Sequence, residues 1–304
     1  MNAAHAHEES QLSPLRIWLT ASRPRTLGAA VAPVVIGTAM AYDAEAFHPV
    51  SALCALAAAL LVQIGTNFAN DYLDFVKGTD TDKRTGPTRV TQAGLVTPET
   101  MRRATVLVFA LIALPAAYAI YRGGWPFLAI AVASVACGVW YTAGPYPLGY
   151  IGLSDVAVLI FFGPVAVGGT YYLQALELPA QVIIAGIAPG LLAVALLTVN
   201  NLRDIEEDRA AGKKTLAVRF GAEFAKMEYL FCIVVSCMAV PLYFYGYTGS
   251  RWFALVALLG LWWGAPAARI LIDPATPEAF HHALARTGMA LLFYSGAFAL
   301  AYIL

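Results

Sequence analysis

Asparagine and aspartate side chains gather in two motifs of a chain that is otherwise poor in acids. The first motif, NDYLDFVKGTDTDKR, begins at residue 70, and the second, NNLRDIEEDRAAGKK, begins at residue 200. In the second motif the spacing of four residues puts Asn200, Asp204 and Asp208 on one face of a helix. The first motif repeats this step, and Gly78 permits a sharp turn that can return a later aspartate to the same place. The candidate metal-binding residues are Asn70, Asp74, Asp80, Asn200, Asp204 and Asp208.

Carboxylates four residues apart on a helix repel one another unless a cation binds between them. Ligands that offer oxygen, without Cys or His, favour a hard cation, and Mg²⁺ held by carboxylates and a substrate phosphate is the natural candidate. Bases follow each motif at short range, at Lys77, Lys83, Arg84 and Arg89 and at Arg203, Arg209, Lys213 and Lys214. Acids that hold a metal beside bases that hold an anion describe a diphosphate site. The alternative is that the helices end here and the charges are solvated caps.

A third segment, YTAGPYPLGYIGLSD, covers residues 141–155 and is rich in Pro, Gly and Tyr. Its composition predicts a rigid, non-helical connector. Tyr141, Tyr146 and Tyr150 could form an aromatic wall, and Asp155 opens the next helix near the positive end of its dipole. The segment could equally be a turn with interfacial tyrosines.

The composition indicates what must position these motifs. The chain has 304 residues, of which 60% are hydrophobic and 12% charged, and its mean hydropathy is +0.67. A net charge of zero excludes a nucleic-acid-binding protein with a basic surface, and the hydrophobicity excludes a disordered chain. The four cysteines lie in apolar stretches without a CxxC pair, so neither a disulfide scaffold nor a zinc site is expected. We therefore expect an all-α, polytopic membrane protein.

A transmembrane helix needs about 20 mostly apolar residues. On this basis we predict about nine spans, near residues 26–42, 51–73, 104–121, 125–142, 153–174, 180–202, 228–247, 251–272 and 285–304. Residues 1–22 lack the basic start and apolar core of a signal peptide. They are expected to form a cytoplasmic N-terminal segment, ahead of a single membrane-embedded domain at 23–304.

The basic residues predict the orientation. With the N-terminus and the loops after even-numbered spans on one side, seventeen Lys and Arg lie there, against only Arg122 and Arg251 opposite. Since positive loops stay inside, this side is read as cytoplasmic. The two motifs lie about 130 residues apart, with four spans between them. This separation suggests an internal repeat whose two acidic ends face each other across one pocket.

With these motifs in hand, the chain resembles the UbiA superfamily of intramembrane prenyltransferases. Within it the chain looks most like the 1,4-dihydroxy-2-naphthoate polyprenyltransferases of menaquinone synthesis. The likeness covers nearly the whole chain, including WLTASRPRTLGAAVAPVVIGTA at the first span. The subfamily assignment depends on NDYLDFVKGTD, whose last Asp follows Asp74 by six residues, where other branches usually place it four residues on. One departure is Ala143, where the branch more usually has glycine.

The resemblance implies a helical bundle around a central cavity that opens sideways to lipid, with the Asp motifs at its cytoplasmic end. It implies Mg²⁺-dependent transfer of a polyprenyl group from polyprenyl diphosphate to 1,4-dihydroxy-2-naphthoate with loss of CO₂, which gives demethylmenaquinol. Catalysis would depend on Asp74, Asp80, Asp204 and Asp208. The diphosphate would contact Lys77, Arg84, Arg89 and Lys213, and Asn67 and Tyr141 would lie near the allylic carbon or the aromatic ring.

Two alternatives stay open. The same machinery could use another aromatic acceptor, such as 4-hydroxybenzoate or homogentisate. A cation-coupled transporter is the other class, although transporters place acidic residues near the bilayer midplane, whereas both motifs here lie at span ends. Quinone synthesis in a chain of this length predicts the bacterial plasma membrane as its location, with the active site on the cytoplasmic side and no nucleic-acid partner.

Overall fold

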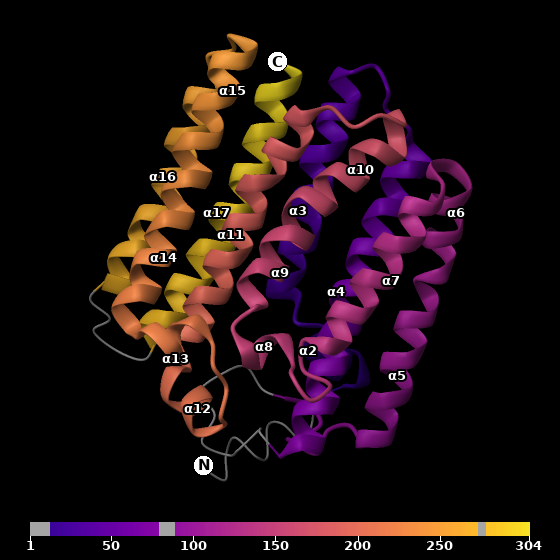
Figure 1. The fold of residues 1–304 in the computed structure, drawn as a ribbon, viewed down its shortest axis with the longest axis vertical. Coiled ribbons are helices and arrows are strands. Elements are labelled where there is room, and N and C mark those ends of the chain that lie inside the picture. Colours follow the sequence, from indigo (N-terminus) through magenta and orange to yellow (C-terminus); the bar gives the residue numbers. More distant parts are fainter. Residues whose placement is uncertain (1–12, 79–88, 273–277) are drawn as a thin grey trace.

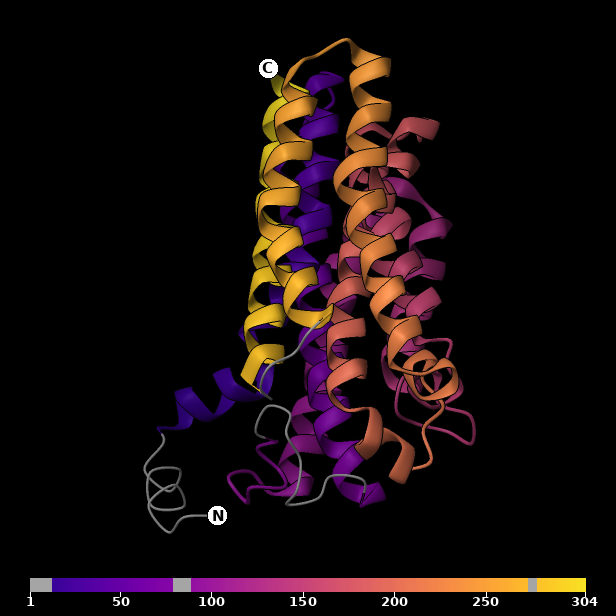
Figure 2. The ribbon, with the colours of Figure 1, turned by 90° about the vertical axis from the view of Figure 1, so that its left-hand side faces the viewer.

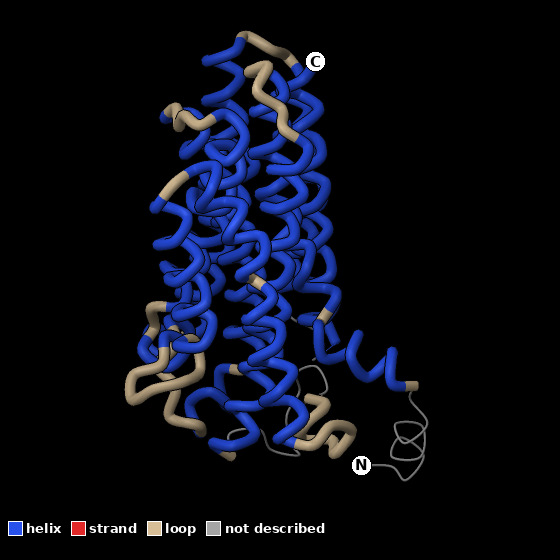
Figure 3. The backbone as a smooth tube through the Cα atoms, turned by 90° about the vertical axis from the view of Figure 1, so that its right-hand side faces the viewer, coloured by secondary structure: helices blue, strands red, loops and turns tan. Residues whose placement is uncertain are grey.

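The computed structural model describes residues 13–78, 89–272 and 278–304. Within these ranges all regular secondary structure is helical, as Figure 3 shows, and the helices run along one long axis. This confirms the all-α class. The helices, labelled as in Figure 1, are α2 (Pro14–Ser22), α3 (Pro24–Asp43), α4 (Pro49–Lys77), α5 (Pro98–Leu111), α6 (Ala113–Gly123), α7 (Trp125–Trp140), α8 (Leu148–Ile151), α9 (Ser154–Ile160), η1 (Phe161–Val165), α10 (Ala166–Ala175), α11 (Ala180–Arg203), α12 (Ile205–Ala210), α13 (Leu216–Phe220), α14 (Ala222–Val234), η2 (Val235–Ala239), α15 (Val240–Thr248), α16 (Trp252–Ile272) and α17 (Glu278–Ile303).

Eight helical stretches in the described ranges are long and apolar enough to cross a membrane, and α7 is a shorter apolar helix of 16 residues. They coincide with the nine predicted spans. Some helices begin earlier than the predicted spans, as α17 does at Glu278 rather than 285. The reason is that the apolar run marks only the part suited to hydrocarbon, and a helix continues into the polar interface where its first turn can be charged. The chain is an integral membrane protein.

The helices alternate in direction, so α4 and α11 end at the same end of the bundle. The short helices α2, α8, α12 and α13 lie at this end, which we call the motif end (Figure 1). The C-terminus lies at the opposite end, and α2 projects sideways from the bundle at the motif end (Figure 2). Of the lysines and arginines in the described ranges, only Arg122 and Arg251 belong to the opposite end.

Helix α4 carries the first motif because it runs beyond the apolar part of its sequence. Its 29 residues span about 43 Å at 1.5 Å per residue, well above the roughly 30 Å of a hydrocarbon core. The helix ends at Gly78, whose φ of 67° lies in the left-handed region that glycine adopts without strain. The last turns of α4, which carry the polar side chains of the first motif, therefore lie at the motif end.

Helix α11 lies inside the bundle and packs closely against η1. A β-carbon at Gly186 would lie 2.8 Å from backbone atoms of Gly163 and Pro164, so only glycine permits this approach. Small residues allow such backbone contact between helices in a membrane. The π-helical turn at η1, which contains Pro164, shifts the register of the side chains that follow. This packing fixes α11, and with it the second motif, relative to α9 and α10.

Candidate active site

The last turns of α4 bury three polar side chains of the first motif. Asn70, Asp71 and Asp74 are 8%, 2% and 7% exposed. A buried carboxylate needs a partner, and the Arg89 guanidinium supplies one at 2.5 Å from Asp74 Oδ2. Arg89 is itself buried, so the pair is shielded from bulk water.

Asp71 positions Arg89. Its two carboxylate oxygens accept hydrogen bonds from the backbone N–H groups of Val90 at 3.1 Å and Thr91 at 3.0 Å. These bonds fix the chain at residues 89–91 against α4, directly beside Asp74. Asp71 therefore has an anchoring role, and the sequence reasoning assigned it none.

The end of α4 is also joined to the segment that follows α7. The Thr142 hydroxyl donates to Asn70 Oδ1 at 2.8 Å, and Lys77 Nζ donates to the Thr142 carbonyl. Thr142 is 3% exposed. Two residues of the first motif thus hold the start of the Tyr-rich segment in place.

The second motif crosses the junction of α11 and α12, where Asp204 leaves the helical conformation with φ −96° and ψ 14°. The N–H of Asp204 donates to Asn200 O at 2.9 Å, and the N–H of Asp208 donates to Asp204 O at 2.7 Å. Hydrogen bonds of four-residue spacing therefore continue through the junction, but the motif is divided between two helices and does not lie on one face of a single helix as predicted. The Asn200 amide donates to Leu196 O at 3.0 Å, so its Oδ1 is not used in that bond.

Each described aspartate of the second motif pairs with a base. Arg203 donates to both oxygens of Asp204, at 2.5 and 2.7 Å. Lys213 Nζ lies 2.8 Å from Asp208 Oδ1. Burial by itself would lower the pKa of Lys213, but the Asp208 and Asp74 carboxylates outweigh it, and the pKa lies above its ordinary value. Lys213 is therefore charged at neutral pH.

Tyr150 connects the two motifs. The Lys77 ammonium lies 5.0 Å from the centroid of its ring, and the Lys213 ammonium lies 5.5 Å from it. Both distances suit a cation–π interaction. One lysine comes from each motif, so the ring holds two cations from distant parts of the sequence at one place. The sequence reasoning considered Tyr150 only as part of an aromatic wall.

Tyr141 lies where the charges of both motifs meet. Burial raises the pKa of its hydroxyl well above the ordinary value, and Asp155, Asp208 and Asp74 raise it further. Tyr141 directly precedes Thr142, which contacts the first motif, and Tyr150 of the same segment contacts lysines of both motifs. The predicted meeting of the motifs is thus present in the tertiary structure.

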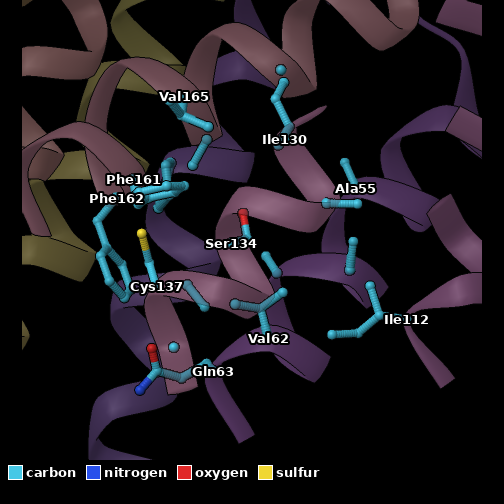
Figure 4. Close-up of a pocket in the computed structure, with 18 of the residues that line it drawn as sticks. Ala55, Val62, Gln63, Ile112, Ile130, Ser134, Cys137, Phe161, Phe162 and Val165 are labelled. Carbon is cyan, nitrogen blue, oxygen red and sulfur yellow. The ribbon is translucent and has the colours of Figure 1, made fainter. Parts of the chain in front are cut away.

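Tyr141 also lines an apolar cavity of about 220 Å³ inside the bundle. The cavity is lined by α3, α4, α6, α7 and the segment α9–η1–α10, with Ile112 between α5 and α6. Figure 4 shows Val62, Phe161, Phe162 and Ile112 around it, with Ser134, Cys137 and Gln63 among its polar groups. Tyr141 and Leu148 belong to its motif end, so the cavity begins beside the charged residues.

Asn67 lies one turn from Asn70 and is 3% exposed. Its amide donates to Ser22 O at 2.9 Å and to Thr26 Oγ1 at 3.1 Å, and its Oδ1 accepts from Gln63 at 3.3 Å. Gln63 lines the cavity. Asn67 thus joins the α2–α3 junction to the cavity wall.

Two predicted site residues, Asp80 and Arg84, lie outside the described residues. Across the ranges 13–78, 89–272 and 278–304 no group of three or more His, Cys, Asp or Glu side chains is close enough to hold a metal ion. The aspartates are paired with bases instead. Their donors nevertheless fit a hard cation, because Asn70, Asp74, Asn200, Asp204 and Asp208 offer only oxygen as ligand atoms.

Thr142 lies within the segment 141–155 that composition singled out, but nothing in the sequence distinguished it from its neighbours. Its role depends on the approach of α7 to α4, which no local pattern encodes. Tyr150 and Asp71 stood within segments already singled out by composition, and their contacts distinguish them from their neighbours.

Comparison with known proteins identifies the family. The model of the UbiA prenyltransferase family matches residues 30–301. The chain is 40% identical over 291 residues to the 1,4-dihydroxy-2-naphthoate octaprenyltransferase of Escherichia coli (strain K12), which covers 92% of both chains. It is 43% identical over 221 residues to the protein of that name from Mycobacterium tuberculosis, over 72% of this chain and 75% of the relative.

Solved structures agree on the fold. A UbiA homolog from Archaeoglobus fulgidus, bound to GPP and Mg²⁺, matches with a TM-score of 0.64 at 16% identity, over 94% of this chain and 99% of that one. A UbiA homolog from Aeropyrum pernix K1 matches with a TM-score of 0.67 over 90% and 98%. The predicted family is confirmed: the chain belongs to the UbiA prenyltransferase family.

Proposed function

We propose that this protein transfers a polyprenyl group from polyprenyl diphosphate to 1,4-dihydroxy-2-naphthoate, with loss of CO₂, to give the demethylmenaquinol of menaquinone biosynthesis. One observation carries the proposal: Tyr150 holds Lys77 and Lys213 from the two motifs at one place, and Tyr141, from the same segment, lines the apolar cavity. A polyprenyl diphosphate consists of a charged head and a long apolar tail. The head would therefore bind at the charged residues of the two motifs, and the tail would bind in the adjacent cavity. The names of the relatives with 40% and 43% identity support this substrate pair.

The diphosphate is assigned to the bases around the two motifs. Three of these bases have partners in the structure: Lys77 donates to a backbone carbonyl, and Arg89 and Lys213 pair with carboxylates. Arg84 is proposed as a further contact. Each would exchange its present partner for an oxygen of the diphosphate, which carries more charge than a single carboxylate. Charge-assisted hydrogen bonds of this kind are among the stronger ones in proteins.

When those bases turn to the diphosphate, the carboxylates beside them become available to Mg²⁺. We assign the metal ligands to Asn70, Asp74, Asp80, Asn200, Asp204 and Asp208. The metal would neutralise the charge that develops on the leaving diphosphate. The bound UbiA homolog of Archaeoglobus fulgidus supports this assignment, since its structure holds GPP and Mg²⁺.

The cavity would keep water away from the allylic carbon once its bond to the diphosphate weakens. Its wall offers few groups that could attack a cation, because most of its side chains are aliphatic or aromatic. Asn67 and Tyr141 are proposed to orient the allylic carbon and the naphthoate ring. The ring carbon forms the new bond to the allylic carbon, diphosphate leaves, and the ring carboxylate departs as CO₂.

The motif end is proposed to face the cytoplasm of a bacterium, with the protein in the plasma membrane. The gathering of basic residues at this end supports the orientation. Residues 1–22 are proposed as a cytoplasmic segment and residues 23–304 as a single membrane-embedded domain.

The test is an incubation of detergent-purified protein with polyprenyl diphosphate, 1,4-dihydroxy-2-naphthoate and Mg²⁺, read by mass spectrometry. A prenylated, decarboxylated product that disappears with EDTA and returns with added Mg²⁺ is expected. 4-Hydroxybenzoate and homogentisate serve as control acceptors. Product formation only with a control acceptor would contradict the assignment of naphthoate as the acceptor but would support prenyl transfer to an aromatic ring. Cation flux in proteoliposomes with no product from any acceptor would contradict the enzyme and favour a transporter.

A further inference from the structure

The cavity has a defined end far from the charged site. Antiparallel helices bring the start of α4, the end of α6, the start of α7 and the end of α10 to one level of the bundle. Ala119, Phe127 and Leu173 form a buried cluster there, and all three line the cavity. We call these three residues the floor cluster.

Phe127 supplies most of the floor, because it carries the only aromatic ring of the three. Its ring lies 5.8 Å from the ring of Tyr172 between centroids, and Phe127 is 8% exposed. A β-carbon at Gly123 would overlap the Phe127 ring, so glycine at that position makes room for it. The ring is therefore held from behind rather than free to swing out of the cavity.

A polar layer closes the bundle behind the floor cluster. Arg122 donates to Leu173 O at 2.7 Å and to Gln174 O at 2.9 Å. The Gln174 amide donates to Thr170 O at 3.0 Å, and its Oε1 accepts from the N–H of His48 at 3.3 Å. These bonds join the ends of α6 and α10 to the start of α4. An apolar chain that passed the floor cluster would contact buried polar groups, so its further extension would add no favourable binding free energy.

The depth of the cavity sets how much of a prenyl chain it can hold. Thr66 and Cys54 line its two ends on α4, and the twelve helical steps from one to the other rise about 18 Å. An isoprene unit contributes four main-chain bonds of about 1.5 Å each, so about three to four extended units fill this depth. A longer chain has to turn aside at the floor, between the helices and into lipid.

We infer that Phe127 is a specificity-determining residue that sets how many isoprene units of the donor are held inside the protein. This inference rests on the proposed function, since it assigns the cavity to the donor tail. Each unit inside buries apolar surface and adds affinity, whereas a unit beyond the floor lies in lipid or detergent in both the free and bound donor and adds little. Affinity should therefore rise with chain length only until the floor is reached.

Two substitutions change the floor in opposite directions. Phe127→Ala removes the ring and deepens the cavity. Gly169→Leu fills the cavity at the same level, because a β-carbon at Gly169 points toward Phe127 Cε1 at 3.9 Å and meets nothing nearer. Leu128→Ala is the matched control, since Leu128 follows Phe127 on α7 and is exposed, outside the cavity.

The experiment measures the affinity of full-length protein for prenyl diphosphates of two to eight units by thermal stabilisation in detergent with Mg²⁺, which requires no turnover. In the unsubstituted protein and in Leu128→Ala, affinity should rise up to about four units and then level off. Phe127→Ala should move this plateau to longer donors. Gly169→Leu should move it to shorter ones, with about a tenfold loss for the four-unit donor and little change for the two-unit donor.

An unchanged plateau in Gly169→Leu would overturn the inference, and so would affinity that keeps rising to eight units in the unsubstituted protein. Gly169→Leu decides the question even if Phe127→Ala does not fold. Product formation from the same donors is read separately. Binding that depends on tail length, without any product, would contradict the proposed reaction and support the role of Phe127. Product formation with a dependence on donor length that neither substitution changes would support the reaction and contradict the role of Phe127.

Discussion

The guanidinium of Arg89 lies 2.5 Å from the carboxylate of Asp74, fifteen residues earlier in the chain, and both side chains are buried. The pair stands where the sequence predicts a metal ligand and a diphosphate contact. In a buried ion pair at a binding site, each charged side chain has a partner within the protein while no ligand is bound. Under the proposed function, the carboxylate would bind a cation and the guanidinium would bind an anion when both arrive together.

Loss of the Arg89 charge should destabilise the protein strongly. Arg89→Ala leaves the buried Asp74 carboxylate without this cation, and such a change costs about 3–5 kcal/mol of the free energy of unfolding. Arg102→Ala is the control, because Arg102 and its partner Glu99 are about half exposed and solvent-exposed ion pairs contribute little to stability. Thermal unfolding in detergent measures both variants. An equal fall in Tm for the two would contradict the importance of the buried pair.

Asp208 should be required for turnover, unlike another acid on the same short helix. Asp208→Asn keeps the size of the side chain and removes its charge, so we expect a loss of about 100-fold or more in kcat, as for the removal of other groups that stabilise developing charge. Glu206→Gln should keep nearly full activity, since Glu206 is exposed and pairs with the exposed Arg209. Rates are followed by diphosphate release. Wild-type rates in Asp208→Asn would remove this residue from the metal ligands.

Asp71 should matter for stability more than for chemistry. Asp71→Ala deprives two backbone N–H groups, those of Val90 and Thr91, of their acceptor. Each unsatisfied buried donor costs about 1–3 kcal/mol, so a lower Tm is expected. The rate per folded molecule should fall less than in Asp208→Asn. A variant with an unchanged Tm would show that the 89–91 segment is held by other contacts.

The ring of Tyr150 should influence the binding of the diphosphate, because it holds Lys77 and Lys213 in place. Tyr150→Leu removes the π face that both ammonium groups contact, and each such contact is worth about 0.5–2 kcal/mol. We expect the KM for the prenyl donor to rise about tenfold. Tyr150→Phe retains the π face and should lose less. Equal KM values in the two variants would assign the effect to something other than the ring face.

The sequence by itself determined the fold class, the number of spans and the family. These follow from patterns that are local in the chain, such as an apolar run long enough to cross a bilayer or an oxygen-bearing side chain every fourth residue. Asn200, Asp204 and Asp208 remain linked by backbone hydrogen bonds of four-residue spacing, although Asp204 divides the motif between two helices. The places where helices begin were less well defined, as at Glu278, since a polar first turn resembles a loop in composition.

Only the tertiary structure decided which groups meet. The contacts of Thr142 with Asn70 and Lys77, the position of Tyr150 between two lysines, and the floor at Phe127 all join residues that are distant in the chain. Such contacts depend on the relative depth and rotation of packed helices. Those are set by close approaches such as that of Gly186 to Gly163, where the whole surfaces of two helices, rather than any single motif, fix the geometry.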